Sequence, residues 1–395
     1  MTSYRIAALL LLVGLTGCRD ATTPAHSESD HRGEGPIKTV DRLVQDLVLN
    51  GHTAGVAVAV QIGDDVPFVK TYGVADVEAE APVRPETRFG IASVTKPFTA
   101  MAIARLVEAD LLRFDDPIER FFPDFPRAGE VTVRDLLAHT SGIADWWMGG
   151  LPEGTPDTWA REPEPHRYLA RMNTVYLVEP GTQFAYASSN YVLLGEIVEA
   201  VTGKPVFMYL DEQVFEPLGM RETGLWGEEA AVPRARGHAR VDAGDSLATS
   251  SFQAVDFPAA QLGAAGGLES SVRDMLVWSR ALFDGELVAD SLLDEMTAYA
   301  HVRDGRPVYD AMYTPPGSPP ASMPGYMQRS GYGLGFNLTD MFGEPVVWHS
   351  GGMPGFNAIW VYIPASRTSL ILVANTDNGA VPAFEEIVRA LVAPA

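Results

Sequence analysis

The sequence predicts a mixed α/β protein of the α+β type, in which helices flank an antiparallel sheet built from both ends of the chain. Two runs near the N-terminus, 54–62 and 66–72, are rich in strand-forming residues, and three similar runs lie near the C-terminus. Apolar residues at helical spacing precede the first run and follow the last. The region between them, about 80–330, carries mainly helical patterns, so we expect a mostly helical insertion within a sheet domain.

The elements follow one another in an order that fits this arrangement. A helix is predicted over 37–49 because one face is apolar, at Val40, Leu43, Val44, Leu47 and Val48. Gly63-Asp64-Asp65 separates the first two strand runs and predicts a hairpin. The insertion contains predicted helices at 95–111, 133–139, 191–201 and 271–283, and Pro/Gly-rich surface loops at 151–166 and 314–326. Strands at 346–349, 356–363 and 369–374 and a helix at 383–392 complete the pattern.

Composition narrows the classes of function. The chain has 395 residues, of which 46% are hydrophobic and 20% charged, as in an ordinary globular protein that can bury a large core. Its formal net charge of -22 repels polyanions, so nucleic acid is not expected as a partner. The same charge favours solubility.

The N-terminus has the pattern of an export signal. Arg5 precedes a short apolar run that ends in Leu15-Thr16-Gly17-Cys18, and Cys18 is the single cysteine of the chain. This run resembles the lipobox of bacterial lipoproteins, although an ordinary buried cysteine is the alternative. The resemblance implies a signal peptide at 1–17, a lipid on Cys18 that anchors the protein to the membrane, and a place in the cell envelope. Residues 18–36 are polar and predict a flexible tether.

Ser93 and Lys96 are candidates for nucleophilic chemistry. Their spacing puts a hydroxyl and an amine on one face if a helix begins there, and Pro97 fits the first turn of a helix. A serine needs a neighbouring base, and a desolvated lysine can supply one. By itself Ser-x-x-Lys is a weak signal, because serine is also a favoured helix cap.

Two further runs support a catalytic role for Ser93 and Lys96. Tyr186-Ala187-Ser188 lies just before an amphipathic helix, and His349-Ser350-Gly351-Gly352 lies at the end of a predicted strand. With Ser93 and Lys96, these runs resemble the serine β-lactamase and penicillin-binding protein superfamily, in the branch of class C β-lactamases, D-Ala-D-Ala carboxypeptidases, D-aminopeptidases and esterases. Further similar runs are Leu136-Leu137-Ala138-His139-Thr140-Ser141-Gly142, Gly266-Gly267-Leu268, Tyr332-Gly333-Leu334-Gly335-Phe336 and Pro354-Gly355-Phe356.

The resemblance covers about 37–392 and implies a β-lactamase/transpeptidase-like fold and an acyl-enzyme mechanism. Ser93 would attack a carbonyl, and Lys96 and Tyr186 would share the proton transfers, with the identity of the base left open. His349 would be a cation or hydrogen-bond donor facing the substrate carboxylate or Tyr186. The N-H groups of Ser93 and Gly352 would form the oxyanion hole, and Ser350 and Gly351 would line the substrate, with Gly351 letting its backbone approach the strand.

Two departures from the family pattern shift the expected substrate. Ser188 stands where the family usually has asparagine, and His349 where class C β-lactamases have lysine. Both changes point away from β-lactams, toward a small ester or a D-amino-acid peptide. Two alternatives remain open, namely a true β-lactamase and a non-catalytic lipoprotein that binds peptidoglycan fragments.

Other residues give weaker signals. His139 lies in a run that the family uses structurally, so we do not count it as catalytic. Trp146, Trp147 and Trp159 fit either the rim of the pocket or a buried patch. The histidines lack metal-site spacing and no glycine-rich phosphate loop occurs, so neither a metal nor another cofactor is expected.

Overall fold

A computed structural model describes residues 35–156, 158–228, 232–241, 251–257, 259–315 and 323–392. The predicted signal peptide, Cys18 and nearly all of the predicted tether lie outside these residues. No helix within the described part of the chain is long and apolar enough to cross a membrane.

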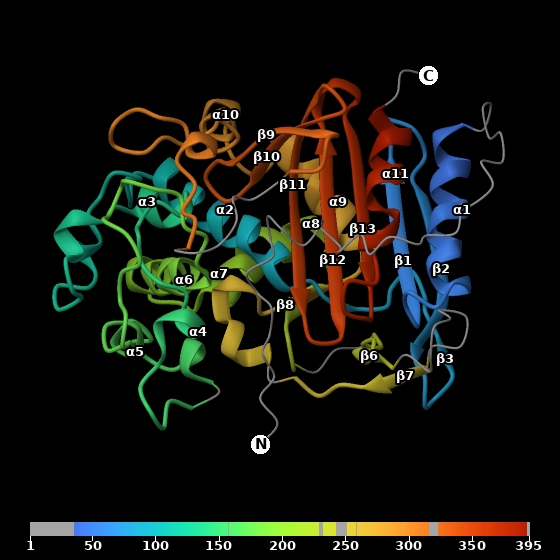
Figure 1. Ribbon diagram of the computed structural model, residues 1–395, viewed down its shortest axis with the longest axis horizontal. Coiled ribbons are helices and arrows are strands. Elements are labelled where there is room, and N and C mark those ends of the chain that lie inside the picture. The colour runs from blue at the N-terminus through green and yellow to red at the C-terminus, as the bar shows by residue number, and fades with distance from the viewer. Residues whose placement is uncertain are drawn as a thin grey trace.

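An eight-stranded antiparallel sheet forms the body of the protein (Figure 1). Both chain ends meet in it, because β1 pairs with β13, where Val56 lies opposite Ala374. The predicted fold class is therefore confirmed. In spatial order the strands are β3 (Ala81–Pro82), β2 (Phe68–Asp76), β1 (Gly55–Gln61), β13 (Thr368–Ala374), β12 (Phe356–Ile363), β11 (Glu344–Met353), β10 (Asn337–Met341) and β9 (Met327–Tyr332).

Alternating side chains of β1 serve two cores. Val56, Val58 and Val60 pack on one face with helices α1 (Pro36–Leu49) and α11 (Val381–Val392), which lie side by side in Figure 1. Ala57 and Ala59 belong to the larger core on the other face, where α9 (Val272–Phe283) covers the sheet. The period of two along a strand explains this division.

The helical region lies beside the sheet (Figure 1). Its central helix, α2 (Thr95–Glu108), is buried around most of its circumference and packs against α6 (Ser188–Thr202). The other helices are α3 (Val133–Leu137), α4 (Trp146–Gly149), α5 (His166–Leu169), α7 (Val206–Leu210), α8 (Glu216–Leu218) and α10 (Asp290–Met296). Two small sheets join this region to the body, β4 (Phe89–Gly90) with β8 (Leu268–Ser270) and β5 (Gly224–Leu225), and β6 (His238–Val241) with β7 (Ser251–Ala254).

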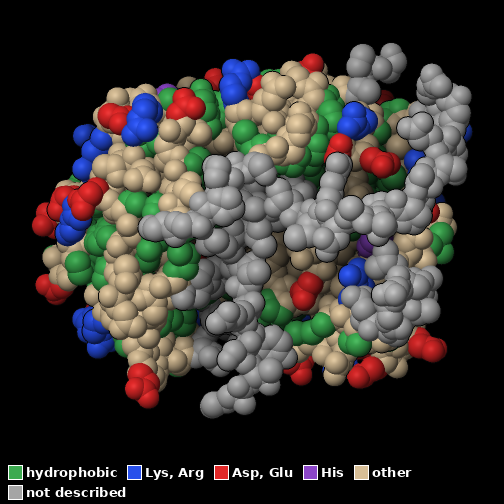
Figure 2. Space-filling view, viewed as in Figure 1, with side chains coloured by type: hydrophobic (Ala, Val, Ile, Leu, Met, Phe, Trp, Pro, Cys, Tyr) green, Lys and Arg blue, Asp and Glu red, His purple; other side chains and the backbone are tan. Residues whose placement is uncertain are grey.

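The sequence patterns do not predict strands β9 and β10. Gln328, Arg329 and Gly331 interrupt the apolar pattern of β9, and its pairing with β10 contains a register shift. Such short, polar strands depend on their neighbours more than on their own residues. The chain thus rejoins the sheet at Met327, slightly before the expected end of the insertion. Acidic and basic side chains are interspersed over the visible surface (Figure 2).

Candidate active site

Ser93 lies on the 3-10 turn η1 (Ala92–Val94), which continues directly into α2. Ala92 has a φ of +46°, an unfavourable conformation for a residue with a side chain, so surrounding contacts must hold this turn in place. Pro97 lies in the first turn of α2, as the sequence predicts. The structure therefore places Ser93 at the entrance to the central helix, on a constrained turn.

Lys96 is fully buried one turn after Ser93. Its Nζ is 3.0 Å from Ser93 Oγ, 2.8 Å from the carbonyl oxygen of Ala265 and 3.4 Å from Ser188 Oγ. Burial lowers the pKa of Lys96 to about 7, and the nearby carboxylate of Asp145 opposes that shift. At neutral pH a large fraction of this amine is therefore uncharged and able to accept a proton.

Tyr186 completes this group from a separate part of the chain. Its ring centroid lies 5.1 Å from Lys96 Nζ. Burial raises the pKa of Tyr186 well above its ordinary value, while an interaction with the Ser93 hydroxyl opposes the rise, so the side chain is a neutral phenol. No group of the described residues has the distance and angles of a full hydrogen bond to the Tyr186 hydroxyl. A buried hydroxyl in that state is available to a reacting group.

Asp145 is a site residue that the sequence reasoning missed. Its Oδ2 accepts a hydrogen bond from the backbone N-H of Ser188 at 2.5 Å, and its side chain is buried. Its charge favours the protonated form of Lys96. The only signal in the sequence is a lone carboxylate between the apolar pairs Ile143-Ala144 and Trp146-Trp147.

His139 lies directly against Tyr186. The two ring centroids are 4.2 Å apart, and His139 Nδ1 is 3.1 Å from the backbone nitrogen of Ala187, which donates to it. Burial, followed by the charge of Lys96, lowers the pKa of His139 well below its ordinary value, so the ring is neutral. The histidine therefore acts as a packing and hydrogen-bonding support for the Tyr186 segment, which agrees with leaving it out of the catalytic set.

The side chain of His349 is fully buried. Its Nδ1 lies 2.8 Å from the carbonyl oxygen of Ser350, which can only accept, so Nδ1 carries the hydrogen. Its Nε2 then accepts from the Tyr332 hydroxyl at 3.0 Å. Burial, with a smaller effect of Lys96, lowers the pKa of His349 to about 3. A protonated, positively charged His349 does not fit these surroundings. Of its two expected roles, that of a neutral hydrogen-bonding group therefore remains a prediction.

Two adjacent glycines of β11 face opposite ways. A Cβ at Gly351 would lie 2.0 Å from the carbonyl oxygen of Ile91 and 3.0 Å from the nitrogen of Ser93, so glycine is needed there to let the nucleophile turn approach. The sequence motif instead predicts that Gly351 makes room for the substrate backbone, so the structure gives this glycine a different reason. Gly352 is exposed, with open space beside it. Asn357 Nδ2 donates to the Gly351 carbonyl at 3.0 Å and fixes this segment.

The other candidate residues from the sequence lie near this group or in the core. Ser188 begins α6 with its hydroxyl toward Lys96, and Ser350 adjoins His349 on β11. Trp146 and Trp159 are both buried, with their ring centroids 5.0 Å apart, so they are core residues. The side chain of Trp147 is not among those that the structure describes. Within the described ranges, no group of three or more His, Cys, Asp or Glu side chains could hold a metal ion.

Comparisons with known proteins show the family and the fold of the chain. The sequence pattern of the Beta-lactamase family matches residues 40–394. A D-aminopeptidase of Gluconobacter oxydans is 27% identical over 85% of this chain, and the esterase EstB of Burkholderia gladioli is 36% identical over 49% of it. The chain spans 58% and 53% of the lengths of these two relatives. A crystal structure of D-amino acid amidase from Ochrobactrum anthropi SV3 superposes with a TM-score of 0.73 at 28% identity, covering 90% of this chain and 98% of the amidase.

Proposed function

The chain belongs to the Beta-lactamase family and is a serine hydrolase, and on that premise we propose that it hydrolyses small esters or D-amino-acid amides through an acyl-enzyme at Ser93. The observation that carries the proposal is the 3.0 Å contact between Ser93 Oγ and a buried Lys96 amine whose pKa is about 7. A base with a pKa near the working pH, within hydrogen-bond reach of a hydroxyl, is what general-base catalysis requires.

The proton transfers can be assigned to named atoms. Neutral Lys96 Nζ takes the proton of Ser93 Oγ as the oxygen attacks the substrate carbonyl, and the N-H groups of Ser93 and Gly352 stabilise the resulting oxyanion. Tyr186 is better suited to donate than to accept, because its pKa is raised. Its hydroxyl, which interacts with that of Ser93, gives a proton to the leaving group and regains one from protonated Lys96. Water then attacks the acyl-enzyme and releases the acid and Ser93.

The substrate class follows from the relatives and from His349. The D-aminopeptidase and the D-amino acid amidase are named for substrates with a D-amino acid, and EstB is named as an esterase. A neutral His349 supplies no positive charge for a substrate carboxylate. We therefore favour amides and esters without a terminal carboxylate over D-Ala-D-Ala peptides.

Intact-protein mass spectrometry after brief exposure to short esters, D-amino-acid amides, D-Ala-D-Ala peptides and a β-lactam tests the proposal. We expect a mass increase equal to the acyl group with an ester or amide, located on Ser93 by peptide mapping. An adduct on another residue would contradict the mechanism. A long-lived adduct with the β-lactam alone would replace the proposed function by that of a penicillin-binding sensor.

We further propose that the protein is a membrane-anchored lipoprotein, which the run Leu15-Thr16-Gly17-Cys18 supports. In a bacterial host, Cys18→Ala is expected to move the protein from the membrane fraction to the soluble fraction, because a lipid with several acyl chains holds a protein far more firmly than electrostatic contact does. Ser93→Ala should stay in the membrane fraction. Equal fractionation of wild type and Cys18→Ala would reject the anchor.

A further inference from the structure

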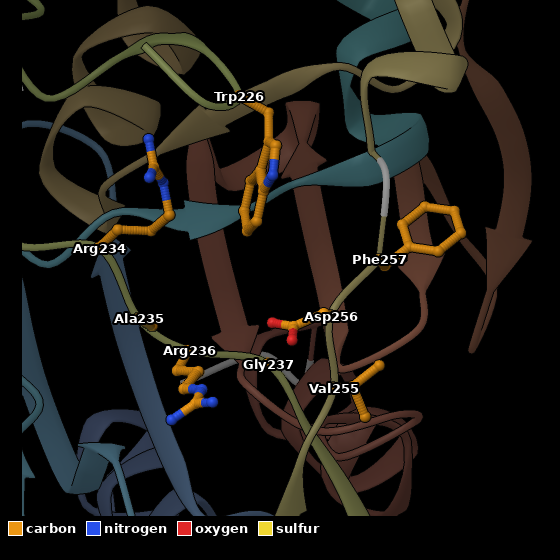
Figure 3. Close-up of a pocket in the computed structure, with 8 residues that line it drawn as sticks. All are labelled: Trp226, Arg234, Ala235, Arg236, Gly237, Val255, Asp256 and Phe257. Carbon is orange, nitrogen blue, oxygen red and sulfur yellow. The ribbon is translucent and has the colours of Figure 1, made fainter. Parts of the chain in front are cut away.

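Two aspartates show how burial decides what a carboxylate can do. Asp256 is exposed on the wall of a cavity of about 690 Å³, which Trp226 and Arg236 also line (Figure 3). Water and salt screen an exposed charge, and none of the described residues that line this cavity belongs to the proposed catalytic group. Asp145 is only 2% exposed, so its charge acts on its neighbours through a medium of low polarity.

Asp145 reaches the catalytic group through Ser188. Its Oδ2 accepts a hydrogen bond from the backbone N-H of Ser188 at 2.5 Å. The hydroxyl of the same serine lies 3.4 Å from Lys96 Nζ. The buried carboxylate and the buried amine therefore share one residue as a neighbour, which contacts the first with its backbone and the second with its side chain.

Proton transfer turns Lys96 into a buried cation. When Nζ takes the proton of Ser93 Oγ, a neutral amine becomes an ammonium group in a side chain that is fully buried. Its hydrogens have acceptors in Ser93 Oγ, Ser188 Oγ and the carbonyl oxygen of Ala265, and none of these acceptors carries a full negative charge in the resting site. A buried charge is strongly unfavourable unless an opposite charge lies nearby.

The other titratable side chains around Lys96 are neutral. Burial lowers the pKa of the two histidines well below neutrality and raises that of the two tyrosines well above it. They are His139, His349, Tyr186 and Tyr191, the last with its ring centroid 5.6 Å from Lys96 Nζ. Among the residues that the structure describes, Asp145 is the charged group that acts on Lys96.

We propose that Asp145 is a positioning residue that stabilises the positive charge formed on Lys96 as this amine takes the Ser93 proton, and that it thereby sets the pH range of the enzyme. The inference rests on the proposed function and adds to it a residue outside the sequence motifs. The aspartate of a Ser-His-Asp triad acts on its imidazolium in the same sense, without being protonated itself. The hydrogen bond from Ser188 keeps the Asp145 carboxylate in place for this role.

Asp145→Asn tests the inference, because it removes the charge but keeps an oxygen that can accept the Ser188 hydrogen bond. In wild type, kcat/KM for p-nitrophenyl butyrate should rise with pH as Lys96 loses its proton, near pH 7. In the variant this rise should lie about one pH unit lower or more, since protonated Lys96 has lost its counter-charge and gives up its proton more readily. At pH 8 the rate should fall between about threefold and tenfold, because the amine is a weaker base. The loss should shrink toward pH 5, where the variant has the larger neutral fraction.

Two further variants separate charge from structure. Asp145→Glu keeps the charge but moves it, so turnover should fall while the rise stays near pH 7. Asp135→Asn is the matched control, since it removes the same charge from a carboxylate that caps α3 and has no effect on Lys96. It should leave the pH of the rise unchanged. Thermal unfolding of each variant shows that the fold is retained.

Loss by the same factor at every pH in Asp145→Asn would overturn the inference and leave Asp145 a purely structural residue. A downward shift in Asp145→Glu as large as that expected for Asp145→Asn would overturn it as well, and this result does not depend on the folding of the asparagine variant. Absence of ester turnover in wild type, or a wild-type rate without a rise near pH 7, would instead reject the proposed function with Lys96 as its base.

Discussion

Ser93→Ala is expected to lower hydrolysis of p-nitrophenyl acetate and butyrate by about 10⁴-fold or more, because loss of the nucleophile removes the covalent route. The substitution also removes the acceptor of one Lys96 hydrogen bond, which costs about 1 kcal/mol of folding stability. The fold should therefore persist. Initial rates at several enzyme concentrations, with thermal unfolding of each variant, measure both effects.

Ser189→Ala provides the matched control for this prediction. Ser189 is buried beside Ser188 in α6, and within the part of the chain that the structure describes its hydroxyl has no hydrogen-bond partner. Its removal should leave activity within about twofold of wild type, since surface and unpaired groups outside a site contribute little. Retention of wild-type turnover by Ser93→Ala would place the nucleophile elsewhere and reject the acyl-enzyme at Ser93.

The sequence predicts the sheet well where strands are buried and apolar. β12 and β13 are continuous apolar runs at the centre of the sheet, and their expected bounds agree closely with those observed. β9 and β10 are not predicted because Arg329 and Asp340 interrupt their apolar patterns. These two residues form an ion pair across the two strands. Hydrophobic periodicity describes a single segment of the sequence, so it cannot reveal a strand that depends on pairing with a distant segment.

The proposed site divides in the same way. Ser93, Lys96 and Tyr186 are found from motifs, because each motif places its residue types at fixed short spacing. Asp145 belongs to no such motif, and Tyr332 lies in a family-like run to which the sequence assigns no role. Their importance comes from contacts with Ser188 and His349 that the fold creates. The charge of His349 could not be predicted either, because its pKa depends on complete burial and on hydrogen bonds at both ring nitrogens.

Burial of Lys96 also separates the two candidates for the base, which the motif leaves open. The group of polar side chains around Ser93 contains Lys96, Tyr186, His139 and His349, together with Asp145. Burial lowers the pKa of both histidines far below neutrality and raises that of Tyr186 well above its ordinary value. Of Lys96, Tyr186 and the two histidines, Lys96, with a pKa of about 7, is the one whose charge changes near neutral pH.

The wild-type enzyme should therefore show a kcat/KM that rises with pH through about 7 and then levels off. The sign follows from the role of the base, since protonated Lys96 cannot accept the Ser93 proton and the protonated fraction grows as pH falls below the pKa. Well below that value the rate should drop about tenfold for each pH unit. A pH profile of p-nitrophenyl butyrate hydrolysis, corrected for the spontaneous reaction, measures it.

Lys96→Met is expected to lower kcat/KM at pH 8 by about 10³-fold, within the usual contribution of a general base, and to abolish the limb near pH 7. Methionine preserves the length and burial of the side chain without an amine, so folding should survive. Lys96→Arg retains the positive charge but cannot lose its proton in this range, and it should be as inactive as Lys96→Met if the amine acts as the base. Substantial activity in Lys96→Arg would mean that the charge at this position matters more than proton transfer, and Tyr186 would then be the stronger candidate for the base.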